Sequence, residues 1–219
     1  DRDEALADRL SLKQKFVAGY VGTHGMAHHL TTLLQAARIL SHDPSMAHVR
    51  FLFLGDGAEK ARLVTIARDM GLDNVIFLDS VPREEVAAFW SLLDVSVIHL
   101  KKTPLFETVI PSKLFECMAM GIPVLHGVAG ESANIVEKEG NGLVFEPENP
   151  EALSECIRRL ARDPDLRRSL ADRGPIAAQR YDRKALALRM LSILEAVHAE
   201  RAVQCSSKRQ ASSSRSART

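Results

Sequence analysis

Short apolar runs alternate with amphipathic stretches between residues 15 and 146, and this alternation limits the possible folds more than any other feature of the sequence. The runs are continuous and rich in β-branched residues, which is typical of strands buried on both faces of a parallel sheet. We predict six strands, which span Lys15–Val21, Val49–Leu54, Asn74–Leu78, Val95–Leu100, Ile122–His126 and Leu143–Phe145.

The stretches between these runs carry apolar residues at helical spacing, as in Leu30, Leu33, Leu34 and Ala37. Glycines and prolines separate the elements, and they are the usual residues at helix and strand ends. We predict helices over Met26–Leu40, Ala58–Met70, Arg83–Leu92, Ser112–Met120 and Ser132–Glu139. Strand–helix repetition predicts an α/β fold: a Rossmann-like, doubly wound parallel sheet of about six strands with helices on both faces.

After residue 147 the pattern becomes entirely helical. We predict C-terminal helices over Pro150–Ala161, Asp165–Gln179 and Asp182–Arg201, with a break in the second at Gly174-Pro175 left open. Residues 202–219 contain six serines and no large apolar residue beyond Val203, a composition typical of disorder. We therefore predict one folded domain over residues 1–201 and a disordered, basic, serine-rich tail over residues 202–219.

The charge of the chain is unevenly distributed. Its net charge of +1 combines 29 basic and 28 acidic residues, but residues 201–219 hold five basic residues and no acidic one. Residues 1–200 are therefore net negative, whereas proteins that bind nucleic acid usually carry a basic patch. We expect no nucleic-acid partner.

The three cysteines, Cys117, Cys156 and Cys205, lie far apart and show no metal-binding spacing. This pattern predicts reduced thiols and no metal site in a cytoplasmic protein. No apolar run reaches the roughly 18 residues that a transmembrane helix needs. The charged N-terminus also lacks the apolar core of a signal peptide.

Ligands of open α/β sheets bind outside the carboxyl ends of the strands, so the loops that follow the strands are the candidate sites. The segment Gly22–Met26 follows the first strand, and its glycines would let the backbone approach a phosphate at a helix N-terminus. Gly55-Asp56-Gly57 follows the second strand, and Asp79–Pro82, with Ser80 and Val81, follows the third. Each segment is also compatible with a plain turn.

The fourth loop, Lys101–Pro111, leads into a helix that opens with Ser112 and Lys113. Glu116 lies one turn further on the same face, since residues three and four apart are neighbours on a helix. A hydroxyl and an ammonium facing phosphates, with a carboxylate for ribose hydroxyls, form a coherent nucleotide site. Because Glu116 precedes an apolar stretch, we expect it to be partly buried. The alternative is a solvated Lys113–Glu116 pair.

These segments together resemble the C-terminal, nucleotide-sugar-binding half of a family 4 retaining glycosyltransferase with the GT-B fold. The resemblance covers about residues 14–200 and rests on KFVAGYVGTHGMAHHL, VRFLFLGDGAEKARL, NVIFLDSVPREEVAAFWSLLDVSVIHL, IPSKLFECMAMGIPVL and GNGLVFEPENPEAL. The segments VGTHGMAH and KKTPLFETVIPSKLFE resemble bacterial transferases of surface-polysaccharide assembly, including O-antigen and capsule enzymes of the N-acetylfucosamine type.

The resemblance implies that Lys113 and Glu116 are the catalytic residues, with Glu116 at the donor ribose. Relatives usually carry a second glutamate, separated from this one by seven residues, but that position is Thr108 here and Glu107 is one residue out of register. Lys101 or Lys102 would add to the positive charge of Lys113. The predicted donor-binding residues are Gly22, Thr23, His24, Gly55, Asp56, Ser80, Val81, Thr108, Pro111, Ser112, Lys113 and Glu116.

The implied reaction moves a hexosyl or N-acetylhexosaminyl group from a UDP-sugar donor to a lipid-linked or glycan acceptor, without a cofactor. An N-terminal acceptor-binding domain would complete the enzyme, so residues 1–219 alone would be inactive. The resemblance also implies an enzyme in the cytoplasm or peripheral at the inner membrane. The alternatives are a non-catalytic nucleotide-sugar-binding subunit and another GT-B enzyme such as a nucleotide-sugar epimerase. A dehydrogenase is disfavoured because no GxGxxG follows the first strand.

Overall fold

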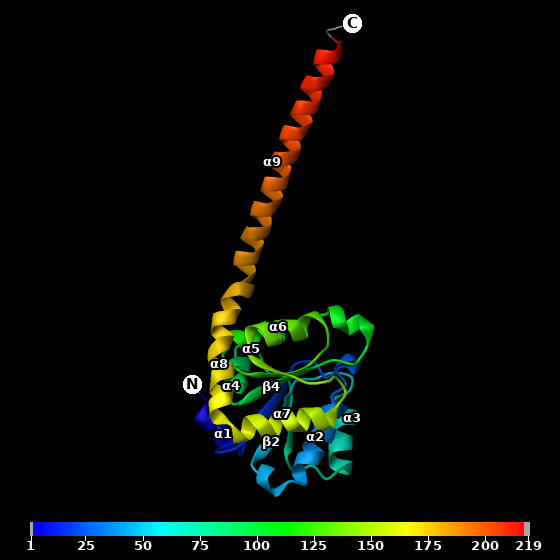
Figure 1. Ribbon diagram of the computed structural model, residues 1–219. Helices are drawn as coiled ribbons and strands as arrows, with labels where there is room; N and C mark the ends of the chain where they lie inside the picture. Colours follow the sequence, from blue (N-terminus) through cyan, green and yellow to red (C-terminus); the bar gives the residue numbers. More distant parts are fainter. Residues whose placement is uncertain (1, 217–219) are drawn as a thin grey trace. The chain divides into compact units, whose positions relative to one another are not determined.

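The computed structural model describes the backbone of residues 2–216 and the side chains of residues 2–199. Its centre is a six-stranded parallel sheet with the order β3-β2-β1-β4-β5-β6 (Figure 1). The strands are β1 (Phe16–Val21), β2 (Val49–Leu54), β3 (Val75–Leu78), β4 (Val95–His99), β5 (Val124–Gly127) and β6 (Gly142–Val144). All six predicted strands are confirmed, with ends shifted by at most two residues.

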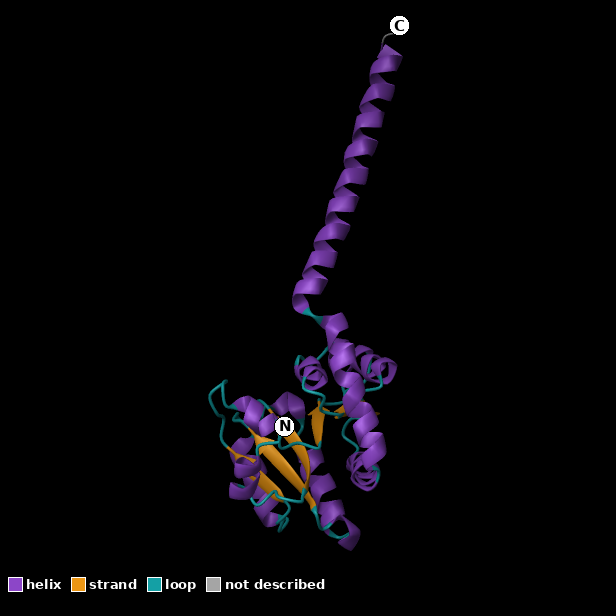
Figure 2. Cartoon of the chain, turned by 90° about the vertical axis from the view of Figure 1, so that its left-hand side faces the viewer, coloured by secondary structure: helices purple, strands orange, loops and turns teal. Residues whose placement is uncertain are grey.

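Helices cover both faces of the sheet, as Figure 1 shows and as the colours of Figure 2 make clear. One face carries α2 (Thr31–Ser41), α3 (Lys60–Asp69) and α7 (Pro150–Arg162). The other carries α4 (Val86–Trp90), α5 (Lys113–Ala119), α6 (Glu131–Glu139) and α8 (Pro164–Ala178). The remaining elements of this part are α1 (Glu4–Arg9), η1 (Met26–His28), η2 (Pro44–Met46) and η3 (Pro104–Thr108). The predicted doubly wound fold is confirmed.

The strand order reverses between β1 and β4, because the chain builds β2 and β3 on one side of β1 and β4 to β6 on the other. The loops after β1 and β4 lead to helices on opposite faces of the sheet, and in open α/β sheets ligands bind at the carboxyl ends of the strands near such a point. Every residue of β1 and of β4 is buried. The centre of the sheet is therefore closed to solvent, and the polar side chains within it, Ser96 and His99 of β4, are buried.

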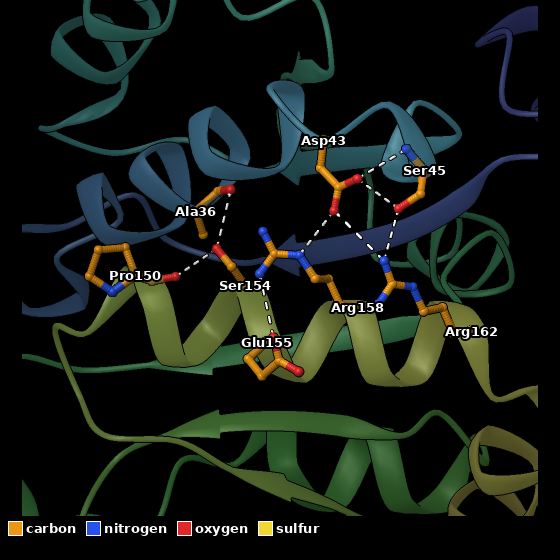
Figure 3. Close-up of polar contacts among 8 residues, drawn as sticks. All are labelled: Ala36, Asp43, Ser45, Pro150, Ser154, Glu155, Arg158 and Arg162. Atoms are coloured by element: carbon orange, nitrogen blue, oxygen red, sulfur yellow. Dashed lines mark hydrogen bonds and ion pairs between the residues drawn. The ribbon is translucent and has the colours of Figure 1, made fainter.

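A network of polar side chains joins α7 to the end of α2, far apart in the sequence (Figure 3). Arg158 donates through Nε to Asp43 at 3.2 Å, and Arg162 donates to the Ser45 hydroxyl at 2.9 Å. The Ser45 hydroxyl donates to Asp43 in turn, and this hydrogen bond, with Arg158, lowers the pKa of the Asp43 carboxyl. Ser154 donates to the Pro150 carbonyl within α7. The network fixes α7 on its face of the sheet.

We expect Arg158→Ala to lower the melting temperature by a few degrees, because it removes a half-buried ion pair and the packing of the arginine stem. The matched control is Arg159→Ala, one residue along α7, where the side chain is exposed. Thermal unfolding followed by circular dichroism measures both. Equal melting temperatures for the two variants would show that the network contributes nothing to stability.

The chain divides into two compact units, residues 1–178 and residues 179–219. Helix α8 runs through the Gly174-Pro175 pair without a break, and the first unit ends with it at Ala178, earlier than the predicted domain boundary at residue 201. The second unit contains η4 (Gln179–Tyr181) and α9 (Arg183–Ser216). None of the helices in the described part of the chain combines the length and apolarity that crossing a bilayer requires.

The structure differs from the predicted disordered tail, because the backbone of residues 202–216 continues helix α9. This segment contains no glycine or proline to end a helix, and its Ala, Gln, Lys and Arg residues have high helix propensity. The many serines and the lack of apolar residues indicated that this segment packs into no hydrophobic core. The hydrogen bonds of a helix form between residues four apart, so such a segment can still continue a helix. Residues 217–219 lie outside the described residues.

Candidate functional site

The loops after β1 and β2 continue the hydrogen bonding of the sheet beyond the ends of the strands. The Gly22 amide donates to the Leu54 carbonyl at 2.9 Å, and the Gly55 amide donates to the Leu78 carbonyl at 3.2 Å. Further out, the His24 amide donates to the Asp56 carbonyl at 2.8 Å. The first two loops are therefore held side by side by their backbones.

Glycine is required where these loops meet. Gly55 has a φ of +142°, and a β-carbon added there would overlap the carbonyl oxygen of Gly22. The backbones approach more closely than any side chain at position 55 would allow. The predicted glycine motif thus serves first to bring two loops into contact, and the surface that results is what a ligand can use.

A pocket of about 280 Å³ opens where the loops after β1, β2 and β3 converge. It brings together six of the predicted donor-binding residues. The lining residues are Val21, Gly22, Thr23, Leu54, Gly55, Asp56, Ser80, Val81 and Val86. The Asp56 carboxylate accepts a hydrogen bond from the Gly57 amide at 2.7 Å, so this side chain shapes its own turn as well as lining the pocket. Three loops that are distant in the sequence therefore form one site.

Lys113 reaches the edge of this site from the first turn of α5. Its ammonium lies 4.1 Å from the ring centroid of Tyr20, and a β-carbon on Gly22 would lie 2.6 Å from the same nitrogen. Burial lowers the pKa of Lys113 to about 8. At pH 7 the site therefore holds a positive charge in a partly desolvated position, which strengthens its attraction for an anion.

Lys60 supports the floor of the site. Its ammonium donates to the Gly55 carbonyl at 2.8 Å, to the Leu78 carbonyl at 3.0 Å and to the Asp79 carboxylate at 2.5 Å. These bonds use all three of its donors. Lys60 thus locks the ends of β2 and β3 together, and its charge is balanced by Asp79.

His99, at the end of β4, joins two other loops. Its Nε2 accepts from the Glu148 amide at 2.9 Å, so its Nδ1–H donates to the His28 carbonyl at 2.7 Å. Burial lowers the pKa of His99 to about 4, which keeps the imidazole neutral, as both hydrogen bonds require. The residue holds the loop after β1 against the loop after β6.

The prediction that His24 contacts the donor is corrected by the position of its side chain. The ring is fully buried, and it packs against the rings of Tyr20, Phe53 and Phe77 at centroid distances of 5.8–6.3 Å. Burial lowers its pKa to about 4, so the imidazole is a neutral member of the core. Only the backbone of His24, which bonds to Asp56 and Glu59, belongs to the loop.

The predicted residues of the fourth loop do not line the pocket. Thr108 is exposed at the end of η3, where its hydroxyl donates to the Leu105 carbonyl. Pro111 is half-buried and Ser112 is exposed at the start of α5. Glu116 is exposed, so the expectation of partial burial is wrong: Cys117 and Met118 turn inward, and Glu116 faces outward. Its carboxylate is therefore accessible to a ligand.

Sequence reasoning missed two residues of the site, Tyr20 and Lys60. Tyr20 occurs in a buried strand two positions before Gly22. A polar phenol in a strand of mostly aliphatic residues was the signal that could have identified it. Lys60 lies just after the second glycine loop, where a lysine reads as an ordinary helix residue. Lys102, considered as an additional cation, is instead paired with Glu146 at 2.6 Å.

Comparisons with known proteins agree with this fold. The family model for glycosyl transferases group 1 matches residues 1–176. The glycosyl transferase WcaI of Escherichia coli K12, named for colanic acid biosynthesis, is 30% identical over 78% of this chain and 42% of that protein. The lipopolysaccharide core biosynthesis glycosyltransferase LpsE of Rhizobium meliloti is 28% identical over 55% of this chain and 34% of that protein.

Among solved structures, that of HepE from Anabaena in complex with UDP superposes with a TM-score of 0.75 at 21% identity, over 88% of this chain and 52% of that chain. This likeness concerns the fold. The chain spans less than half the length of the two curated relatives. Since the family model covers most of its residues, the chain belongs to the glycosyl transferases group 1 family.

Proposed function

We propose that this chain is the donor-binding half of a glycosyltransferase that uses a UDP-sugar in bacterial surface-polysaccharide biosynthesis. The observation that carries the proposal is the glycine-lined pocket at the carboxyl ends of β1, β2 and β3, with the ammonium of Lys113 beside Gly22. A partly buried positive charge against a bare backbone suits a diphosphate, whose leaving-group charge must be neutralised during transfer. The relatives named for polysaccharide biosynthesis and the UDP complex of HepE support this assignment.

In this proposal each part of the site has a role. Lys113 neutralises the diphosphate without a metal ion or cofactor, and the exposed carboxylate of Glu116 accepts hydrogen bonds from the ribose hydroxyls. The loop that carries Ser80 and Val81 contacts the base. The transferred group is a hexosyl or N-acetylhexosaminyl sugar, of the N-acetylfucosamine type, and its configuration is retained; these details rest on the sequence resemblance.

The acceptor is a lipid-linked or growing glycan. We propose that it binds a second, N-terminal domain, because the chain covers about half of the chain of HepE. It follows that residues 1–219 alone bind the donor without transferring sugar, and that the enzyme works in the cytoplasm or peripherally at the inner membrane. Transfer by residues 1–219 with no partner present would contradict this.

Isothermal titration of the chain with UDP and with UMP tests the site. We expect UDP to bind more tightly than UMP, because only UDP presents the second phosphate to Lys113. Glu116→Ala is expected to weaken UDP binding about tenfold, the equivalent of one charge-assisted hydrogen bond. The control Glu137→Ala removes an equally exposed carboxylate on α6 and should leave the affinity unchanged. No heat at millimolar UDP would refute the proposed site.

A further inference from the structure

Tyr20 occupies an unusual place in the site, because it lies in the core and beneath the ammonium of Lys113 at once. The residue belongs to the central strand β1, and only 1% of its surface is exposed. Its ring packs on Phe53 on the apolar side. The ammonium of Lys113, which belongs to α5 and is distant in the sequence, lies over the ring face at 4.1 Å from the centroid. One aromatic side chain thus connects the core to the cation of the proposed diphosphate site.

The hydroxyl of Tyr20 makes a second connection to the same site. It donates a hydrogen bond of 2.8 Å to the carbonyl of Thr23, which lines the pocket. The loop of Gly22 and Thr23 is therefore tied to the ring that carries the lysine. Gly22 closes the arrangement, since a β-carbon there would lie 2.6 Å from the Lys113 nitrogen. The ammonium is confined between an aromatic face and a bare backbone.

The charges around Lys113 explain why the ring matters. From the loop after β1 and from η1, His24 and His28 face the lysine, and burial lowers the pKa of both imidazoles, so they remain neutral at pH 7. From α5, Cys117 and Glu116 face it; burial raises the pKa of the thiol to about 12, so only Glu116 bears a negative charge. Burial also raises the pKa of the Tyr20 phenol, which stays neutral. The negative face of the ring, 4.1 Å from the ammonium, also favours the cation.

We propose that Tyr20 is the positioning residue of Lys113: its ring holds the ammonium against Gly22 and its hydroxyl fixes the neighbouring loop, so that both are preformed for a diphosphate. This inference rests on the proposed function. It predicts that UDP affinity falls as the pH rises from 7 through about 8, where the lysine loses its proton. Because the ring acts through the lysine, the loss of UDP affinity on removing the ring is part of the loss on removing the lysine, and the two losses are not additive.

The experiment compares Tyr20→Phe, which keeps the ring, with Tyr20→Leu, which loses it, in the 219-residue chain. The matched control is Phe51→Leu, an equally buried aromatic on β2 whose backbone pairs with Ala18. Titration calorimetry with UDP at pH 6.5 to 9 gives the affinities. We expect Tyr20→Phe, which loses only the hydrogen bond to Thr23, to lose about threefold in affinity, Tyr20→Leu to lose at least tenfold, and Phe51→Leu to resemble the parent. The double variant with Lys113→Met should lose no more than Lys113→Met alone.

A nucleotide-free measurement separates this inference from the proposed function. The rate at which an acylating reagent labels Lys113, followed by mass spectrometry against pH, reports the protonation of its amine. We expect the midpoint of this profile to fall in Tyr20→Leu and to stay in place in Tyr20→Phe and Phe51→Leu. If UDP fails to bind the parent chain, the proposed function is lost, and the labelling profile still decides the role of Tyr20. An unchanged midpoint in Tyr20→Leu, or additive losses in the double variant, would overturn it.

Discussion

Lys113→Met is expected to weaken the binding of UDP by about 10- to 100-fold at pH 7. Hydrogen bonds to charged groups contribute about 1.5–3 kcal/mol, and a factor of ten in affinity corresponds to about 1.4 kcal/mol. Methionine has a similar length, and its thioether packs well on aromatic rings, so the space between Tyr20 and Gly22 stays filled. The variant should therefore fold normally and lose only the charge. Calorimetric titration with UDP measures the loss.

The matched control is Lys102→Met, which removes a lysine whose ammonium is already paired with Glu146. The two lysines differ in the groups that surround their charge, and only Lys113 is held against the pocket loop. We expect the control to bind UDP as the parent does. If both variants bind UDP equally well, the diphosphate is neutralised elsewhere and the assigned role of Lys113 is wrong.

Gly55→Ala is expected to lower the free energy of unfolding by about 2–5 kcal/mol, the sum of backbone strain at positive φ and of an added methyl group in a filled space. The new β-carbon would overlap the Gly22 carbonyl, which is backbone and cannot move aside as a side chain does. The loops after β1 and β2 would be forced apart, so UDP binding should be lost together with stability. Urea unfolding measures the first effect and calorimetry the second.

Gly71→Ala is the control that isolates the contact. Gly71 also has positive φ, at +64°, but a β-carbon there meets nothing within 4 Å. Only the left-handed conformation then opposes alanine, at about 1 kcal/mol. A loss in Gly55→Ala no larger than in Gly71→Ala would mean that the loops can separate at little cost.

The order of elements and the sheet could be predicted because both depend on local pattern. Continuous apolar runs such as Val49–Leu54 reach the core on both faces, and strands of a parallel sheet are the short elements that permit this. The position of the site followed from topology alone, since the carboxyl ends of parallel strands share one edge. Gly22, Gly55 and Ser80 therefore meet in one pocket, as their places after successive strands predicted.

The orientation of individual side chains could not be predicted in the same way. His24 lies within the glycine loop and faces the core, whereas Lys113 arrives from a distant helix to contact Tyr20. Glu116 precedes an apolar stretch and is nevertheless exposed, because the face of a short helix that turns inward depends on what packs against it. Each of these outcomes depends on contacts between residues far apart in the chain.

The sequence by itself determined the doubly wound sheet, the loops that form the site and the order of the motifs that resemble the family. Periodicity and turn residues act over a few neighbouring positions, so they can be read without the fold. Only the tertiary structure decided that the ammonium of Lys113 lies between the ring of Tyr20 and the backbone of Gly22. The physical reason is that burial and electrostatics depend on the whole surroundings of a group, and those surroundings exist only once α5 has packed against β4 and α8.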